Sequence, residues 1–406
     1  MKKLPSVEKV LEEECVSLAV NAFSRGGIIR LIRDSIGRYR EALLNGEKDA
    51  SGEEILAGIA GEVAGEIRRI GSSVQRRVIN ATGVVLHTNL GRAPLGQSLL
   101  GEILTLQSGY TDLEVDTATG ERTHRERRAA RLLSLITGAE SALVVNNTAA
   151  AILLAVDTFA GGGAVAVSRG ELVEIGGSFR LPEILRKGAG RVMEIGTTNR
   201  TNLKDYEKAI DDGATMLLKV HTSNYRIVGY TDDVPLARLA ALGRERDVPV
   251  MYDQGSGVLF PLGSEGITGE EDIASLLSSG VDMMAFSGDK VLGGPQSGIV
   301  IGSERHIGKM RGNHLARALR VDKLTLACLE ETLCRYWRGE ARDIPALRMI
   351  LSGSDVSKKR AEAFAADLEK VLPEGARVTL SEGESSIGGG SFPATPLPAT
   401  IIELGL

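Results

Sequence analysis

The chain has 406 residues, of which 43% are hydrophobic and 25% are charged, and its formal net charge is −5. This composition is that of an ordinary folded protein and excludes collagen-like, low-complexity and wholly disordered chains. The acidic balance argues against nucleic-acid binding over the whole surface, and the length predicts two or three domains.

The start of the chain carries no pattern for secretion or membrane insertion. Acidic residues follow its two lysines where a signal peptide requires an apolar run, and the sequence has no charge-free run of 18 apolar residues. Cys15, Cys328 and Cys334 form no C-x-x-C pair. We therefore expect reduced thiols, a cytoplasmic location and no contact with a membrane.

Residues 1–75 have a helical pattern and form the first predicted domain. Ser6 is the expected N-cap of a first helix, and further helices are expected at about 25–44 and 53–70. Residues 24–40 contain five arginines and one aspartate, a local charge of +4. Such a helix suits an RNA backbone, although a basic helix is more often a solvated surface.

From residue 76 onward, short apolar runs alternate with helical patterns. This predicts an α/β core domain over 76–308, with a largely parallel sheet that binds its ligand at the carboxyl ends of the strands. A smaller C-terminal α/β domain is predicted over 309–406, with helices at about 315–338 and 361–371. Core strands are expected at 142–145, 164–167, 191–195, 215–220, 248–253, 281–286 and 298–301.

The motif AFSGDKVLGGPQSG (285–298) places Lys290 just beyond a strand, in a glycine-lined turn. A partly desolvated amine has a lowered pKa and suits a Schiff base with a carbonyl cofactor. Ser287 is expected to donate a hydrogen bond to a phosphate. A solvated loop lysine is the alternative interpretation.

Two further strand ends carry polar side chains. Asp253 precedes Lys290 by 37 residues and ends a buried strand, where a carboxylate is costly unless it is paired. It suits the pyridinium nitrogen of pyridoxal phosphate, or else caps the glycine-rich turn that follows. Asn146, Asn147 and Thr148 begin a helix and are candidates for a phosphate cradle, although taken alone they favour a simple asparagine N-cap.

A cradle, an aspartate and a lysine in this order are typical of the aminotransferase-like class of pyridoxal phosphate enzymes, fold type I. Ser223 or Asn224 is expected to reach the phenolic oxygen of that cofactor. His221 belongs either to the cofactor site or to the core. No metal site is predicted, because the five histidines lack short spacings to cysteines or carboxylates.

Arginines in two segments indicate an anionic substrate. Arg92 lies in a glycine-punctuated loop, and Arg317 and Arg320 are three residues apart on one predicted helix face. Guanidinium groups suit a phosphate-like oxyanion, although a solvated helix face is the simpler interpretation of the pair. Basic residues also gather at 122–128.

Long motifs spread over most of the chain together resemble the bacterial selenocysteine synthase family, the L-seryl-tRNA(Sec) selenium transferases. The opening LPSVEKVL also resembles the tRNA-binding domain of that family, and the resemblance runs from about residue 4 to about residue 400. The motifs are INATGVVLHTNLGRAPL (79–95), SRGELVEIGGSFRLPEIL (168–185), EIGTTNRTNLKDY (194–206), KVHTSNYRIVGYT (219–231), DQGSG (253–257), FSGDKVLGGPQSG (286–298) and RALRVDKLTL (317–326).

The resemblance implies a cytoplasmic, pyridoxal phosphate-dependent enzyme that assembles as a ring of dimers, a decamer. Such an enzyme converts L-seryl-tRNA(Sec) to L-selenocysteinyl-tRNA(Sec) with selenophosphate, through a dehydroalanyl-tRNA intermediate. Residues 1–75 would hold the tRNA. By motif, Lys290 would hold the cofactor, Asp253 would pair with its pyridine nitrogen, Asp289 would stand beside the lysine, and Arg92, Arg317 and Arg320 would bind selenophosphate.

The sequence departs from the family pattern in places. Thr148 stands where a third asparagine is favoured, and His314 where proline is usual. Family chains continue past this chain's last segment, so the domain at 309–406 is expected to be incomplete. The alternatives are a pyridoxal phosphate lyase for a small phosphorylated amino acid or amino-sugar acid, which would not need the domain at 1–75, and a truncated inactive remnant.

Overall fold

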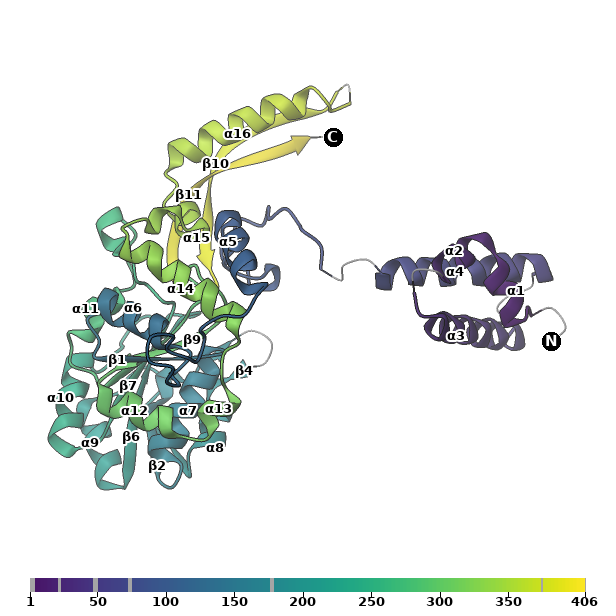
Figure 1. Ribbon diagram of the computed structural model, residues 1–406. Helices are drawn as coiled ribbons and strands as arrows, with labels where there is room; N and C mark the ends of the chain where they lie inside the picture. The colour runs from purple at the N-terminus through teal and green to yellow at the C-terminus, as the bar shows by residue number, and fades with distance from the viewer. Residues whose placement is uncertain are drawn as a thin grey trace. The chain divides into compact units, whose positions relative to one another are not determined.

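The computed structural model describes residues 4–20, 23–46, 50–71, 75–175, 179–373 and 375–405. The chain divides into two compact units, Met1–Ile79 and Asn80–Leu406, which are described separately below (Figure 1). The predicted boundary between the core and the C-terminal domain at residue 308 stays a prediction. None of the helices in these described ranges is both long enough and apolar enough to cross a membrane.

The first unit is a small helical bundle. Ser6 caps its first helix by accepting a hydrogen bond from the backbone N–H of Lys9, as expected. Isoleucines spaced four residues apart on the third and fourth helices fill the core of the unit. The helices are α1 (Val7–Glu12), α2 (Glu14–Val20), α3 (Arg25–Leu44) and α4 (Gly52–Gly71), and the two longer ones confirm the predicted helices.

All five arginines of α3 point to solvent. One of them, Arg38, forms a salt bridge with Glu62 of α4, and Ser35 donates a hydrogen bond of 2.8 Å to the same carboxylate. The apolar side of α3 is buried through Ile28 and Ile32. The local positive charge expected from the sequence therefore lies on the solvent side of this helix.

The second unit is built on a seven-stranded sheet in the order β1-β9-β8-β7-β6-β2-β5. Neighbouring strands from β8 to β5 are parallel, whereas β9 runs antiparallel to both β1 and β8. The predicted largely parallel sheet is confirmed. The strands are β1 (Ser141–Val145), β2 (Ala164–Ser168), β5 (Arg191–Ile195), β6 (Ala214–Val220), β7 (Val250–Gly255), β8 (Met283–Ser287) and β9 (Gly298–Gly302).

Helices cover both faces of this sheet, which explains why its strands are apolar on both sides. Successive strand residues face opposite cores: Leu217 packs into one cluster and Leu218 into the other. One face is covered by α7 (Thr148–Ala160), α8 (Leu181–Gly188) and α12 (Glu304–Gly312), and the other by α6 (Arg127–Thr137), α9 (Leu203–Asp211), α10 (Leu236–Arg246) and α14 (Lys323–Trp337).

The region after the sheet differs from its prediction. The single helix expected at 315–338 is interrupted, because Asp322 accepts hydrogen bonds from the backbone N–H groups of Leu324 and Thr325 and starts a new helix there. The helix expected at 361–371 begins earlier, at Ser354. The elements are α13 (Leu315–Ala318), α14, α15 (Pro345–Ile350), α16 (Ser354–Glu369), β10 (Arg377–Gly388) and β11 (Ser391–Gly405).

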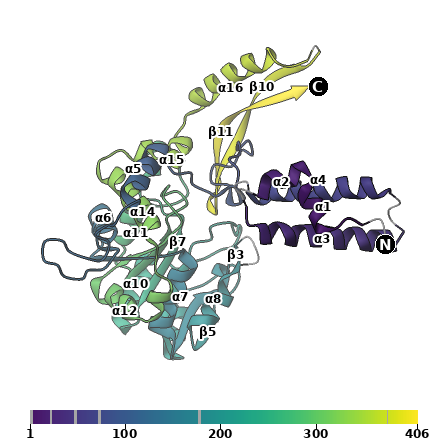
Figure 2. The same cartoon turned by 45° about the vertical axis from the view of Figure 1, so that its right-hand side comes forward.

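The strands β10 and β11 form a long antiparallel hairpin. Helix α16 lies along the outer part of this hairpin (Figure 1 and Figure 2). The turn, Gly388 to Gly390, has φ angles of 78°, 66° and 73°, which explains its three glycines. The N–H groups of Val85 and Leu86 bind the hairpin just before this turn, so the turn is anchored against the sheet domain.

Short elements complete the described part of the second unit. They are α5 (Gln97–Gln107), α11 (Ile273–Leu277), the strand pair β3 (Glu174–Ile175) and β4 (Phe179–Arg180), and the 3-10 turns η1 (Thr88–Leu90), η2 (Arg169–Glu171), η3 (Leu262–Glu265) and η4 (Ala341–Asp343).

Candidate active site

A cavity of about 320 Å³ opens at the carboxyl ends of β6, β7 and β8, beside the first turn of α7. Its position is the one expected for the ligand site of such a sheet. Of the predicted site residues, Asn146, Arg317 and Arg320 do not line it. Those that do are Arg92, Asn147, Thr148, Ser223, Asp253, Ser287, Asp289 and Lys290.

The turn after β8 places Lys290 in this cavity. A side chain at Gly288 would begin 2.1 Å from Ser297 Oγ, so only glycine fits there. The turn closes where the N–H of Gly293 donates to the carbonyl oxygen of Lys290, at 3.0 Å. As a result Lys290 is only 6% exposed.

Burial makes Lys290 a reactive amine. Desolvation lowers the pKa of its ammonium group, the carboxylate of Asp253 opposes that effect, and the charge of Arg92 adds to it. Within the described residues, Nζ forms no salt bridge that would hold the charge in place. A neutral amine of this kind is both a nucleophile and a proton acceptor.

Asp253 lines the same cavity. Burial raises its pKa to about 6, against the attraction of Lys290 and His221. Its Oδ1 is buried and has no hydrogen-bond donor among the residues that the structure describes. Gly255, with φ +73°, lies against both groups, since a Cβ built on it would be 3.8 Å from this oxygen and 3.8 Å from Lys290 Nζ.

Two of the three residues predicted for the phosphate cradle, Asn147 and Thr148, line the cavity at the start of α7. Asn147 caps the helix through a 2.8 Å hydrogen bond from the N–H of Ala150, and Thr148 Oγ1 lies 2.6 Å from Ser287 Oγ. Hydroxyl groups and N–H groups at a helix N-terminus suit a phosphate. Asn146 instead binds the carbonyl oxygen of Leu319 through its backbone N–H, and its side chain is exposed.

Asp289 and Arg92 form a salt bridge at the rim, with 2.7 Å between Oδ2 and Nη1. Arg92 has a left-handed backbone with φ +58°, and the next N–H, that of Ala93, donates to the carbonyl oxygen of Asp289. Such a conformation is strained for arginine and is retained only where neighbouring contacts hold it. The geometry fixes one guanidinium group beside the cavity.

The prediction that Arg317 and Arg320 share a helix face is wrong. The helix α13 ends at Ala318, since the chain leaves it to pair with the end of β1, where Arg320 forms a bridge with Val145. Arg320 Nη1 lies 3.1 Å from Glu114 Oε1.

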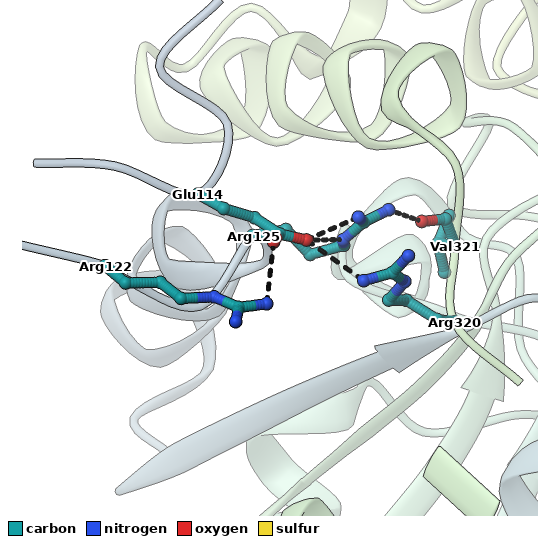
Figure 3. Close-up of polar contacts among 5 residues, drawn as sticks. All are labelled: Glu114, Arg122, Arg125, Arg320 and Val321. Carbon is teal, nitrogen blue, oxygen red and sulfur yellow. Dashed lines mark hydrogen bonds and ion pairs between the residues drawn. The ribbon is translucent and has the colours of Figure 1, made fainter. Parts of the chain in front are cut away.

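The same carboxylate binds two more arginines. Figure 3 shows Arg122, Arg125 and Arg320 converging on Glu114, and Arg125 also donates to the carbonyl oxygen of Val321 at 2.7 Å. Elsewhere in the predicted basic run at 122–128, Arg127 pairs with Asp112 and Asp116, and Arg128 with Glu330. This run therefore presents less free positive charge than its sequence indicates.

Two features of the site were absent from the sequence-based prediction. Glu270, 2% exposed, lies 3.3 Å from His221 Nε2 and accepts a 2.5 Å hydrogen bond from the N–H of Phe392. A Cβ on Gly390 would lie 3.8 Å from Lys290 Nζ, so the turn of the C-terminal hairpin reaches the lysine. No motif or strand end in the sequence marks these positions.

The contacts of Glu270 also decide its charge. Burial alone would raise its pKa, but the contact with His221 and the hydrogen bonds from the N–H of Phe392 and from Ser256 outweigh burial and lower it. Of the two residues proposed for the phenolic oxygen, Ser223 lines the cavity, whereas Asn224 donates to the carbonyl oxygen of Glu174.

These residues fit pyridoxal phosphate. The partnerless Oδ1 of Asp253 can accept from a protonated ring nitrogen, the N-terminus of α7 can hold the phosphate, and Lys290 can bond the aldehyde carbon. Fold and site together define a pyridoxal phosphate enzyme of fold type I.

The comparisons with known proteins agree with this assignment. The sequence profile of the L-seryl-tRNA selenium transferase family matches residues 78–405. The L-seryl-tRNA(Sec) selenium transferase of Geobacter metallireducens is 43% identical over 99% of this chain and 87% of its own length, and that of Nitratidesulfovibrio vulgaris is 46% identical over 92% and 80%. The solved structure of a D-glucosaminate-6-phosphate ammonia-lyase has a TM-score of 0.57 at 20% identity, covering 80% of this chain and 79% of that one.

The chain belongs to the L-seryl-tRNA selenium transferase family. It is an enzyme that depends on pyridoxal phosphate. The alternative of a small-substrate lyase is not favoured, because the likeness to the ammonia-lyase rests on 20% identity and shows the fold alone.

Proposed function

We propose that this enzyme converts L-seryl-tRNA(Sec) to L-selenocysteinyl-tRNA(Sec) with selenophosphate as the selenium donor. The observation that carries the proposal is a buried amine of lowered pKa, Lys290, that shares its cavity with Asp253, whose buried Oδ1 has no hydrogen-bond partner in the described part of the chain. Family membership supports seryl-tRNA as the substrate.

Bound pyridoxal phosphate supplies an electron sink that permits deprotonation at Cα of the seryl group and loss of its hydroxyl from Cβ. Lys290 would hold the cofactor through its aldehyde carbon, and its free amine would then accept the Cα proton. A lowered pKa suits this task, because the amine must be neutral to accept a proton. Asp253 would hold a proton at the ring nitrogen.

The remaining cavity residues would position the cofactor and the donor. Thr148, Ser287 and the first N–H groups of α7 would bind the phosphate, and Ser223 the phenolic oxygen. Arg92 would bind the anionic selenium donor, oriented by its salt bridge with Asp289. That Arg317 and Arg320 bind the selenium donor stays a prediction, since neither residue lines this cavity.

The exposed arginines of α3 support a tRNA-binding role for the N-terminal unit. The three free cysteines support a cytoplasmic location, where tRNA is found. We also propose a homo-oligomer, a ring of dimers. Light scattering on the purified protein would show about ten chains for a decamer, and a monomer would contradict this part of the proposal.

The decisive experiment supplies the purified holoenzyme with selenophosphate and seryl-tRNA(Sec), with seryl-tRNA(Ser) as the matched control. We expect selenocysteinyl-tRNA from the first substrate, detected by mass spectrometry, and no conversion of the second. Turnover of a small phosphorylated amino acid without any conversion of seryl-tRNA(Sec) would overturn the proposal.

A further inference from the structure

A second cavity, of about 350 Å³, opens at the same edge of the sheet. Val220 and His221 line both this cavity and the first one, so the two are neighbours. Its outer walls are the loops 197–201 and 226–233. The reaction described above assigns no role to this second cavity.

Hydrogen bonds between its two loops make the second cavity a formed site. Asn199 Nδ2 donates to the carbonyl oxygen of Tyr230 at 2.5 Å, and the N–H of Asp232 donates to the carbonyl oxygen of Asn199 at 3.0 Å. The N–H of Thr201 in turn donates a 3.0 Å hydrogen bond to the carbonyl oxygen of Asp232. A site tied together in this way loses little freedom when it binds a ligand.

The charges of the second cavity fall into two groups. In its buried part, Lys219 Nζ lies 3.1 Å from Glu171 Oε1 and 2.9 Å from Asp233 Oδ2, so this ammonium group is already neutralised. At its exposed part, Arg200 and Arg226 form no salt bridge with any residue that the structure describes. Two guanidinium groups are thus available for an anion.

Other groups indicate that the anion is part of a nucleotide. Asp232, an exposed carboxylate, also lines the second cavity, and a carboxylate there repels a bare phosphate but accepts hydrogen bonds from ribose hydroxyls. The loop that carries Arg226 also exposes Tyr230 to 87% and Val228 to 84%. Tyr230 does not itself line the cavity, but an exposed aromatic ring on an arginine-bearing loop suits the stacking of an unpaired base.

We propose that the second cavity binds the unpaired 3′-terminal nucleotides of the aminoacyl-tRNA. Arg200 and Arg226 pair with backbone phosphates, Asp232 accepts from a ribose hydroxyl, and Tyr230 stacks on a base. The inference rests on the proposed function, because the seryl group that enters the first cavity is esterified to the terminal ribose. That ribose must therefore lie directly beside the Lys290 cavity, where the second cavity opens.

The direct test is binding of the trinucleotide CCA to the holoenzyme, measured by calorimetry. We expect Arg200→Gln and Arg226→Gln each to weaken this binding about tenfold. Each should also lower the slope of log affinity against log salt concentration by about one, which corresponds to one lost phosphate contact. Tyr230→Ala should weaken it about fivefold or more, and Tyr230→Phe should restore it, because either ring stacks. Arg246→Gln, at the amino edge of the sheet, is the matched control and should change nothing.

The role of Asp232 has its own readout. The wild type should bind CCA more tightly than the deoxy trinucleotide dCdCdA. The Asp232→Asn variant should show a smaller ratio between these two affinities. Unchanged CCA binding in both arginine variants would overturn the inference.

Kinetic measurements distinguish whether the second cavity binds the phosphates of the tRNA or selenophosphate. For seryl-tRNA(Sec), the arginine variants should raise KM about tenfold while kcat and the KM for selenophosphate stay within twofold. A rise confined to the KM for selenophosphate would overturn the inference and assign the cavity to the donor. If the wild type binds CCA through these residues but converts no seryl-tRNA, the proposed function fails and the nucleotide site stands.

Discussion

Two lysines are buried at the same edge of one sheet and have opposite properties. Lys219, near the end of β6, lies between Glu171 and Asp233, and Lys290 follows β8. Burial alone would lower the pKa of either ammonium group. At Lys219 the two carboxylates outweigh burial and raise it, whereas at Lys290 burial prevails over the attraction of Asp253.

The difference teaches that burial by itself does not make a reactive amine. Lys219 is held as an ammonium ion by contacts of 3.1 Å or less, and it ties β6 to the turn at Glu171. Lys290 lacks such a contact, and the positive charge of Arg92 further disfavours its protonation. One lysine is a structural cation, and the other is a candidate catalytic base.

Lys290→Ala should have the largest effect. We expect the absorbance band of the bound cofactor to disappear and activity to fall by at least about 10³-fold, because the general base is lost as well as the attachment point. Absorbance scans and single-turnover assays measure both. Lys219→Met is the matched control and should retain the band; a band that survived in Lys290→Ala would contradict the assignment.

Lys219→Met should mainly reduce stability. Removing the cation leaves Glu171 buried without its partner, which should lower the free energy of unfolding by about 3 kcal/mol. Urea unfolding of the cofactor-free protein measures this. The double variant with Glu171→Gln should recover much of the loss, and equal stability of Lys219→Met and the wild type would show that the pair is not structural.

Asp253→Asn should stabilise the cofactor-free protein, in a way that depends on pH. The folded pKa of Asp253, about 6, lies above its ordinary value, so the wild type loses stability as the pH rises from about 4 to 6. A folded pKa about two pH units above the ordinary one corresponds to about 3 kcal/mol in the free energy of unfolding. The variant should equal the wild type near pH 4 and exceed it above pH 6.

The same Asp253→Asn variant should bind the cofactor more weakly, since an amide does not hold the ring proton. Unfolding curves at several pH values and a cofactor titration test the two effects separately. A stability difference that does not change between pH 4 and 7 would contradict the raised pKa.

Glu270→Gln should have the smallest effect, about 1–2 kcal/mol at neutral pH, because the amide keeps part of the hydrogen bonding. The folded pKa of Glu270 is lowered, so its contribution to stability is present above the ordinary glutamate pKa and is lost as the pH falls through the folded value. Unfolding at pH 7 and at pH 4 measures the change. Its exposed neighbour provides the control, Glu271→Gln, which should have no effect at either pH.

The predictable part of the site lies at strand ends. Lys290, Asp253 and Ser287 follow apolar runs whose lengths reveal the strands, and parallel strands bring such ends to one edge. The helix expected through Arg317 and Arg320 was wrong because a local pattern did not reveal the interruption before Asp322.

Glu270 and Gly390 were missed for a different reason. Each acts through a contact between distant segments: Glu270 with the N–H of Phe392, and Gly390 with the surroundings of Ser223 and Lys290. Hydrophobic periodicity reports on neighbours along a helix or strand and carries no information about such pairs.

The amino-acid sequence by itself determined which segments become strands and that a lysine, an aspartate and a helix start follow three of them, because apolar runs and glycine turns are local properties. Only the tertiary structure decided which buried lysine is charged. That outcome depends on distances between segments far apart in the chain: Glu171 reaches Lys219, whereas no carboxylate among the described residues forms a salt bridge with Lys290, and burial lowers its pKa.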